Sequence, residues 1–477
     1  MWPPEREVYA NRTLNLRSVQ AIGYDMDYTL IHYRVEDWET ESFEHARELL
    51  GGRGWPVDDL VFEPDEFLQG LVIDVHLGNL VKATRFGYVI AARHGDHWLS
   101  FEEIRADYAG DFVDLDDRRW VFLNTMFSLS EAALFQQLVD RLDAGRAPGV
   151  YDYEDLHREV RAAIDDSHAI GELKATIQAD PERFVVRDHG VAQTLLDQRA
   201  AGKTLLLVTN SEWSYTNAMM SWYFEGLLPT DQVPDGSWRS LFDIVVVSAS
   251  KPGFFEGRNQ AFRVVDPDTG ALMPHRGPYE VGEAYHGGTA AMVEETLGLA
   301  GDQILYVGDH LFGDVHASKA TLRWRTALIL SELEDEIAAA REFAESEREL
   351  TDLMAEKSTL ERELAEVRLD VVHGRAGRRR VDALARKIRT IDERIGPLAR
   401  TATLLGGSPW GPLMRSGSDK SLFARQVERS ADIYTSRVSN LGHRTPFAYL
   451  RAARTTLPHD IEHDIGHGLE RATAPDT

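Results

Sequence analysis

The sequence predicts an α/β protein: a doubly wound parallel sheet with an inserted, mostly helical cap domain and a long helical hairpin. Five apolar runs separated by helical stretches predict the strands, and near-continuous aliphatic strands are typical of a parallel sheet covered on both faces. These runs lie at residues 17–22, 203–211, 241–252, 303–315 and 324–330. About 170 residues separate the first two runs, far more than a crossover helix needs, which predicts the insert.

Four parts follow from this pattern. Residues 1–32 and 188–330 are expected to form a discontinuous catalytic core, and residues 33–187 the cap, with helical patterns at 130–142 and 153–168. Residues 331–400 are charged and helical with a break at 373–378, which predicts an antiparallel hairpin that serves as a structural or oligomerising arm. Residues 401–477 are expected to pack on the core and to end in a disordered, histidine-rich tail.

Composition excludes several classes of protein. The chain has 477 residues, 43% of them hydrophobic, and a net charge of −26, which argues against a nucleic acid polymer as partner but leaves room for a small anionic ligand. There is no cysteine, and neither a secretory signal nor a membrane-spanning apolar run is present. We therefore expect a cytoplasmic protein without a membrane partner.

Polar side chains gather where the predicted strands end. In a parallel sheet the carboxyl ends of the strands share one edge, so these side chains are expected to form one site. They are Asp25, Asp27, Thr29, Thr209, Asn210, Ser211, Lys251, Asp309 and Asp314. Carboxylates bind hard divalent cations, whereas hydroxyl, amide and ammonium groups bind phosphate oxygens. The set matches the needs of phosphoryl transfer, although each member alone is commonplace in turns and helix caps.

The motifs resemble those of a known superfamily. DMDYTL at 25–30, TNS at 209–211, Lys251 with Pro252, and GDHLFGD at 308–314 are similar to the four motifs of the haloacid dehalogenase superfamily, which has a Rossmann-like core. The match is closer to its cytosolic purine 5′-nucleotidases, which prefer IMP and GMP. Further runs carry this likeness: NRTL at 11–14, SDKSLFARQV at 418–427 and YTSRVSNL at 434–441.

The resemblance implies a role for each core residue. Asp25 would attack phosphorus to give an aspartyl-phosphate, and Asp27 would protonate the leaving oxygen and then deprotonate water. Mg²⁺ would be held by the Asp25 carboxylate, the Asp27 carbonyl and Asp309, with Asp314 positioning the metal's waters or Lys251. Thr209, Asn210 and Lys251 would hold the phosphoryl oxygens.

The cap offers candidates for substrate recognition. Arg161, Asp165 and His168 share one helix face, a spacing that by itself favours a solvated salt-bridged face. The resemblance implies instead a substrate pocket made by Arg161, Asp165, His168 and Lys174, with Asn124 and Phe127 at the base. Phe127 could equally be a core aromatic. An arginine donor and an aspartate acceptor suit the edge of a 6-oxopurine, which predicts preference for IMP or GMP over AMP.

The chain also departs from the branch. Ala169 replaces an aromatic and Ser128 an amide, which predicts weaker or broader base recognition. Phe312 matches an effector-stacking position, but SKATLRWR at 318–325 is not the usual lysine-rich segment, and an acidic run at the C-terminus is missing. The resemblance also implies a homo-oligomer, dimer or tetramer.

Two alternatives remain. The first keeps the aspartyl-phosphate but is a nucleoside phosphotransferase or a phosphatase of another small phosphorylated metabolite. The second is a non-catalytic nucleotide-binding scaffold whose hairpin is the functional surface. The complete set of motif residues argues against this second alternative.

Overall fold

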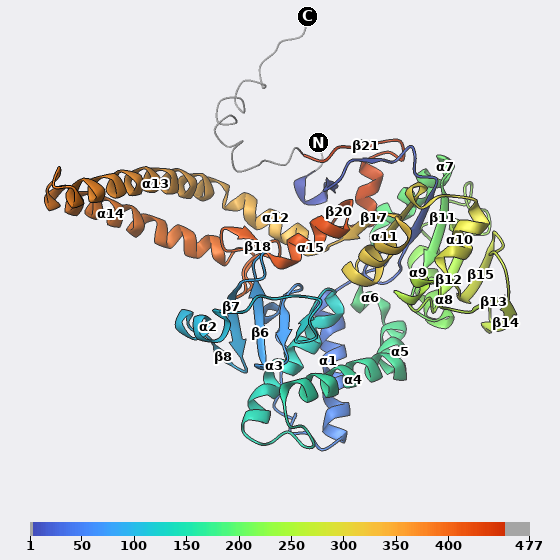
Figure 1. The fold of residues 1–477 in the computed structure, drawn as a ribbon. Coiled ribbons are helices and arrows are strands. Elements are labelled where there is room, and N and C mark those ends of the chain that lie inside the picture. Colours follow the sequence, from blue (N-terminus) through green and yellow to red (C-terminus); the bar gives the residue numbers. More distant parts are fainter. Residues whose placement is uncertain (1–2, 454–477) are drawn as a thin grey trace, which may run out of the picture.

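The computed structural model describes residues 3–453, and its centre is a ten-stranded sheet (Figure 1). The strand order is β1-β20-β17-β16-β3-β11-β12-β15-β13-β14. Seven neighbouring strands run parallel: β20 (Ile433–Thr435), β17 (Arg325–Ile329), β16 (Ile304–Gly308), β3 (Ala21–Tyr24), β11 (Thr204–Val208), β12 (Ile244–Val247) and β15 (Glu283–Gly287). The antiparallel edges are β1 (Tyr9–Ala10), β13 (Ala261–Asp266) and β14 (Ala271–His275).

The central strands form because their aliphatic side chains are buried on both faces of the sheet. All residues of β3, β12 and β16 are buried, and five helices flank the sheet (Figure 1). These helices are α7 (His189–Ala200), α8 (Trp213–Phe224), α9 (Gly253–Glu256), α10 (Ala290–Leu297) and α11 (Ala317–Leu322). The predicted α/β class with a parallel sheet is confirmed.

The inserted domain begins and ends at one short strand pair. The chain leaves the core through β4 (His32–Tyr33) and returns through β10 (Val185–Val186), which pair antiparallel. Between them lie the helices α1 (Val35–Gly52), α2 (Phe101–Tyr108), α3 (Leu129–Asp143), α4 (Tyr153–Ile170), α5 (Glu172–Ala179) and α6 (Pro181–Phe184). One hydrophobic cluster joins α1, α3 and α4 to the core sheet, so the cap is packed on the core.

The cap also contains a five-stranded antiparallel sheet that the helical patterns did not predict. Its order is β8-β7-β6-β5-β9, from His97–Trp98, Val89–His94, Asn79–Ala83, Val72–Asp74 and Trp120–Phe122. Polar residues interrupt its buried strands and hide the strand pattern. Asp74 forms an ion pair with Arg119 at 2.8 Å, and Lys82 donates to the Trp410 and Pro412 carbonyls at 2.6 Å.

The hairpin and the C-terminal segment complete the molecule. Helix α12 (Leu333–Glu342) leads into α13 (Ala344–Val372) and α14 (Arg378–Thr403), which project as a long antiparallel pair (Figure 1). After it come β18 (Arg415–Ser416), β19 (Asp419–Lys420), α15 (Leu422–Ser430) and β20, and then β21 (Tyr449–Leu450), which pairs with β2 (Leu14–Asn15). The predicted disordered tail and its histidines lie beyond residue 453, outside the described residues. Within residues 3–453, no helix combines the length and the apolar character needed to cross a membrane.

Candidate active site

The carboxyl ends of three adjacent strands bring the first site residues together. Asp25 follows β3, and its backbone N–H donates to the Val307 carbonyl of β16 at 2.9 Å. Thr209 follows β11 on the other side of β3, and Asp309 follows β16. The structure therefore places these side chains at one edge of the sheet, where ligands of open α/β sheets bind.

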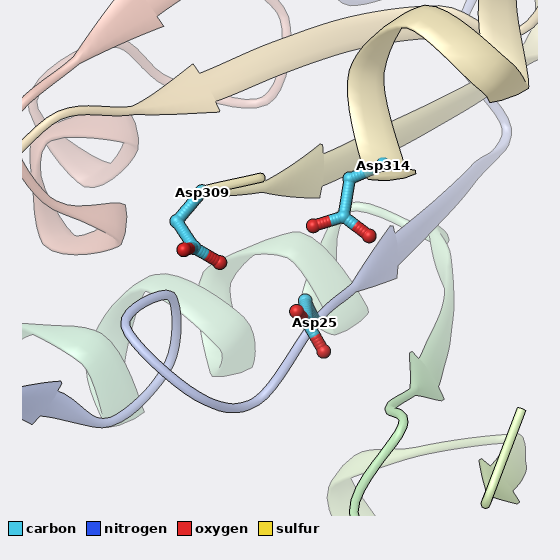
Figure 2. A group of neighbouring side chains, drawn as sticks. All are labelled: Asp25, Asp309 and Asp314. Atoms are coloured by element: carbon cyan, nitrogen blue, oxygen red, sulfur yellow. The ribbon is translucent and has the colours of Figure 1, made fainter. Parts of the chain in front are cut away.

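Three buried carboxylates converge at this edge. Asp25, Asp309 and Asp314 each offer an oxygen, and the three atoms lie within 4.8 Å of one another (Figure 2). Lys251 is buried against them, with its Nζ 2.8 Å from Asp25 Oδ1 and 2.7 Å from Asp314 Oδ1. One ammonium thus pairs with two of the three carboxylates, and the cluster keeps an excess of negative charge.

The pKa values reflect this excess of negative charge. Burial raises the pKa of Asp25 to about 6, with Lys251 opposing and Asp314 adding to the rise. Burial, together with the charges of Asp25 and Asp314, raises the pKa of Asp309 well above its usual range. Burial opposes the charged form of Lys251, but Asp25 and Asp314 still raise its pKa well above normal. A divalent cation would offset the remaining charge, and oxygen ligands fit Mg²⁺.

Local structure after β16 explains how Asp309 and Asp314 come to lie side by side. The chain turns through the π-helical segment Leu311–His316, in which the Gly313 N–H donates to His310 Nδ1 at 2.8 Å. A Cβ on Gly308 would lie 2.4 Å from Asp314 Oδ2, so only glycine admits this carboxylate beside the strand. Single-turn π-helical segments are frequent at functional sites.

Asp27 faces a different set of groups. Its Oδ1 accepts from the Tyr33 hydroxyl and its Oδ2 from the Ser211 hydroxyl, each at 2.7 Å, and Tyr33 also contacts the Tyr215 hydroxyl at 3.0 Å. Burial and the nearby charge of Asp25 raise the pKa of Asp27, whereas the two hydroxyl donors lower it. Neither Tyr33 nor Tyr215 could be predicted from the sequence, because nothing in their spacing sets them apart from core aromatics.

Thr209 and Asn210 are engaged locally. The Ser211 N–H donates to Thr209 Oγ1 at 3.1 Å. Asn210 Oδ1 accepts from the Lys251 N–H at 2.7 Å, and its Nδ2 donates to the Lys251 carbonyl at 3.3 Å. The Asn210 amide therefore holds the backbone that carries Lys251. The predicted role of Asn210 in binding phosphate did not include this contact.

A cavity of about 680 Å³ joins these groups to the cap. Asp25, Asp27, Thr209, Asn210, Lys251, Asp309 and Asp314 line it from the core, and Asn124, Phe127, Arg161, Asp165 and Lys174 from the cap. The side chain of His168 lies outside what the structure describes. Ser211 also lines it, whereas Thr29 does not: the Thr29 hydroxyl lies behind the site and donates to Asp309 Oδ1 at 3.5 Å. The other predicted site residues thus border one cavity, within the size range of small-molecule sites.

The cap residues are held by partners that the sequence did not reveal. Arg161 Nη1 lies 2.8 Å from the buried Glu131 Oε2, and its Nε lies 3.2 Å from Asp165. Lys174 Nζ lies 2.6 Å from Glu212. The ion pair between Arg161 and Asp165 is the one that helical spacing predicted. Spacing alone favoured a solvated surface for it, whereas both residues line the cavity. Glu131 was missed because it sits on another helix.

Phe127 combines both of its expected environments. Its ring packs edge-on against Tyr28, with centroids 4.7 Å apart, and against Trp38 at 5.5 Å, while it also lines the cavity. Nearby, Asn124 donates to the Phe122 carbonyl at 3.1 Å, and its buried Oδ1 has no hydrogen-bond partner. Buried amide oxygens are normally paired, so this oxygen is a candidate for ligand contact.

The family model described as the 5′ nucleotidase family matches residues 8–462. The chain belongs to this family. It is 29% identical over 476 residues to human 5′-nucleotidase domain-containing protein 2, an alignment that covers 95% of this chain and 85% of the relative. The predicted class of enzyme, a 5′-nucleotidase and hence a phosphoric monoester hydrolase, is confirmed at this level.

Two solved structures also resemble the chain. One is a haloacid dehalogenase-like family hydrolase from Xanthomonas campestris, at 12% identity and TM-score 0.24, covering 65% of this chain and 82% of that one. The other is a predicted phosphoglycolate phosphatase from Haemophilus somnus 129PT, at 13% identity and TM-score 0.28, covering 65% and 85%. These scores are too low to add to the argument.

Proposed function

We propose that this protein is a Mg²⁺-dependent hydrolase of purine nucleoside 5′-monophosphates, with IMP and GMP preferred, acting through an aspartyl-phosphate on Asp25. The observation that carries the proposal is the shared cavity: the buried aspartates and Lys251 border it from the core, and Arg161 and Asp165 from the cap. A nucleotide in this cavity could place its phosphoryl group at the core residues and its base at Arg161 and Asp165 of the cap.

The chain's own groups suit the two displacements. Asp25 attacks phosphorus, and its carboxylate is kept beside Lys251, whose ammonium also neutralises phosphoryl oxygens. Asp27 donates its proton to the leaving 5′-oxygen and then takes one from water. Because hydroxyl groups both donate and accept, Tyr33 and Ser211 fit either protonation state of Asp27.

Asp25, Asp309 and Asp314 would hold Mg²⁺ when it is bound, and the ion would neutralise charge on the phosphoryl group. The main support for the ion in this chain is the convergence of three buried carboxylates, of which only Asp25 and Asp314 pair with Lys251.

Recognition of a 6-oxopurine would fall to the cap. Arg161 carries guanidinium donors for a carbonyl oxygen, and Asp165 is an acceptor for the N–H at position 1. Adenine lacks that N–H and would leave Asp165 facing a lone pair, which sites built on hydrogen bonds penalise strongly.

The decisive experiment measures phosphate release from IMP, GMP, AMP, CMP and a sugar phosphate, with Mg²⁺ and with EDTA, for the wild type and for Asp25→Asn. We expect metal-dependent turnover of IMP and GMP that is lost in the variant. Equal rates for AMP would contradict the base assignment alone. Added inosine tests for transfer of the phosphoryl group to an acceptor.

A homo-oligomer, dimer or tetramer, and a cytoplasmic location remain part of the proposal. The first rests on the family resemblance, and light scattering of the purified protein tests it. The second is supported by the absence of cysteine from the sequence, and fractionation of cells tests it.

A further inference from the structure

A second cavity, of about 490 Å³, lies where the cap joins the core. We call it the hinge cavity, because His32 and Tyr33 of β4 and Val186 of β10 line it, at the two points where the chain crosses between the domains. Its other walls come from the cap around residues 64–69, from the start of α12 and from residues 405–413. None of the predicted site residues lines it.

Two buried oxygen atoms on its walls have no hydrogen-bond partner. Gln69 is 3% exposed, and its Nε2 donates to the Asn124 carbonyl at 2.9 Å, which leaves its Oε1 free. Glu332 Oε1 is likewise buried and free, while its other oxygen accepts from Ser331 at 3.3 Å. Burial raises the pKa of Glu332 to about 7. Gln69 Oε1 is an acceptor, and Glu332 Oε1 is an acceptor when its carboxyl is ionised, the form that a nearby cation favours, so the missing partner is a donor.

The charge of the cavity points to a cationic donor. Six carboxylates line it: Glu36, Asp65, Glu332, Glu334, Asp335 and Glu336. Two arginines also line the cavity: Arg437 neutralises one of the six carboxylates, Glu334, and Arg34 is engaged by backbone carbonyls. Arg437 binds Glu334 at 2.7 and 2.8 Å, and Arg34 donates to the Glu182 and Val185 carbonyls at 2.8 and 2.9 Å. Burial lowers the pKa of His32 to about 4, which leaves it neutral.

The arrangement favours an organic cation over a metal ion. In the part of the chain that the structure describes, only Asp25, Asp309 and Asp314 bring three ligand atoms within 4.8 Å, so the carboxylates of the hinge cavity do not converge on a point. Apolar side chains line the same cavity: Phe67, Leu68, Met126, Leu129, Leu405 and Leu413. Charges spaced along apolar walls suit ammonium groups joined by methylene chains.

We propose that the hinge cavity binds a linear aliphatic polyamine, whose ammonium groups donate to Glu332 and Gln69 and whose methylene chain packs on Phe67 and Leu413. The site shares a wall with the catalytic cavity. Met126 and Leu129 face the hinge cavity, whereas Thr125 and Phe127, in the same segment, line the catalytic one. A bound polyamine would therefore lie against the segment that carries the base-contacting candidates.

The test is calorimetric titration of the full chain with spermidine, at fixed ionic strength, without nucleotide and with saturating Mg²⁺ to occupy the catalytic carboxylates. We expect one saturable site. Glu332→Gln should weaken binding about tenfold or more, because it removes a charge-assisted hydrogen bond. Glu36→Gln should weaken it less. The substitution Glu225→Gln, at an exposed residue directly after α8 and outside the cavity lining, should leave binding unchanged. 1,8-Octanediol, an uncharged chain of similar length, should not bind.

Two results would overturn the proposal. One is the absence of saturable binding by the wild type. The other is equal affinity for spermidine in the folded Glu332→Gln, Glu36→Gln and Glu225→Gln proteins. That result would mean that the measured heat comes from the overall negative charge of the molecule and not from binding in the hinge cavity. Thermal melting of each variant establishes that it is folded.

Discussion

The hydroxyl of Tyr33 donates a 2.7 Å hydrogen bond to Oδ1 of Asp27, and the same hydroxyl contacts that of Tyr215. Tyr33 belongs to β4, which pairs with β10 where the chain enters and leaves the cap, so the proposed general acid is tied to the point where the cap begins. We expect Tyr33→Phe to lower kcat by about 10- to 100-fold with little change in KM, because a hydrogen bond to a charged group contributes about 1.5–3 kcal/mol. Steady-state kinetics measure this. Tyr24→Phe, which removes another buried hydroxyl that donates to Gln198, is the control. An unchanged kcat in Tyr33→Phe would refute the role.

Removal of Lys251 should destabilise the protein as well as inactivate it. Lys251→Met leaves Asp25 and Asp314 buried without their cation, and breaking one partner of a buried pair costs about 3–5 kcal/mol. Urea unfolding without Mg²⁺ measures the loss. Lys357→Met, at a pair on the exposed hairpin, should cost less than about 1 kcal/mol. Similar losses in the two variants would contradict the prediction.

Mg²⁺ should stabilise the folded protein. An ion that binds only the folded state raises the melting temperature by mass action, and the crowded carboxylates provide the site. Asp309→Asn should abolish the shift without lowering the melting temperature in EDTA, because it removes one of the mutually repelling charges. The exposed Asp302→Asn should keep the full shift. A Mg²⁺ shift retained by Asp309→Asn would place the ion elsewhere.

Base discrimination should depend on Asp165. We expect Asp165→Asn to reduce the ratio of kcat/KM for IMP over AMP by about tenfold or more, because a site that hydrogen-bonds a substrate N–H rejects analogues that lack it. The neighbouring Asp166→Asn is a matched control, since Asp166 binds Arg53 at 2.7 Å and does not line the cavity. Equal ratios in the two variants would remove Asp165 from the recognition site.

Glu39 should make stability depend on pH. It is fully buried, one of its oxygens has no partner, and burial raises its pKa from 4.5 to about 8. The folded state therefore holds this proton more tightly than the unfolded state, and the wild type loses stability as pH rises from about 4.5 to 8. Glu39→Gln should remove that loss, so its advantage in free energy of unfolding should grow across the same range. Denaturant unfolding at pH 5, 6.5 and 8 measures it. The free energy of unfolding of Glu48→Gln, a change at an exposed residue, should vary with pH in the same way as that of the wild type.

Local pattern was enough to predict much of the core. The strand-forming runs around Ile22, Leu206 and Val307 are continuous and apolar because both faces of a parallel sheet are covered, and the structure places a strand at each. Their shared direction made it foreseeable that Asp25, Thr209 and Asp309 would meet. The hairpin could also be predicted from the sequence, because helix periodicity and the break at 373–378 are local signals.

Contacts between distant segments were decided only by the tertiary structure. The cap sheet was hidden because its buried polar residues, such as Lys82, find partners more than 300 positions away, at the Trp410 carbonyl. Glu131 beside Arg161 and Tyr33 beside Asp27 are pairings across elements that no spacing along one helix or strand encodes. The sequence by itself determined which groups stand at the ends of the strands, because that follows from chain direction. Which partners hold those groups and shift their pKa values depends on packing between elements, and only the folded chain sets it.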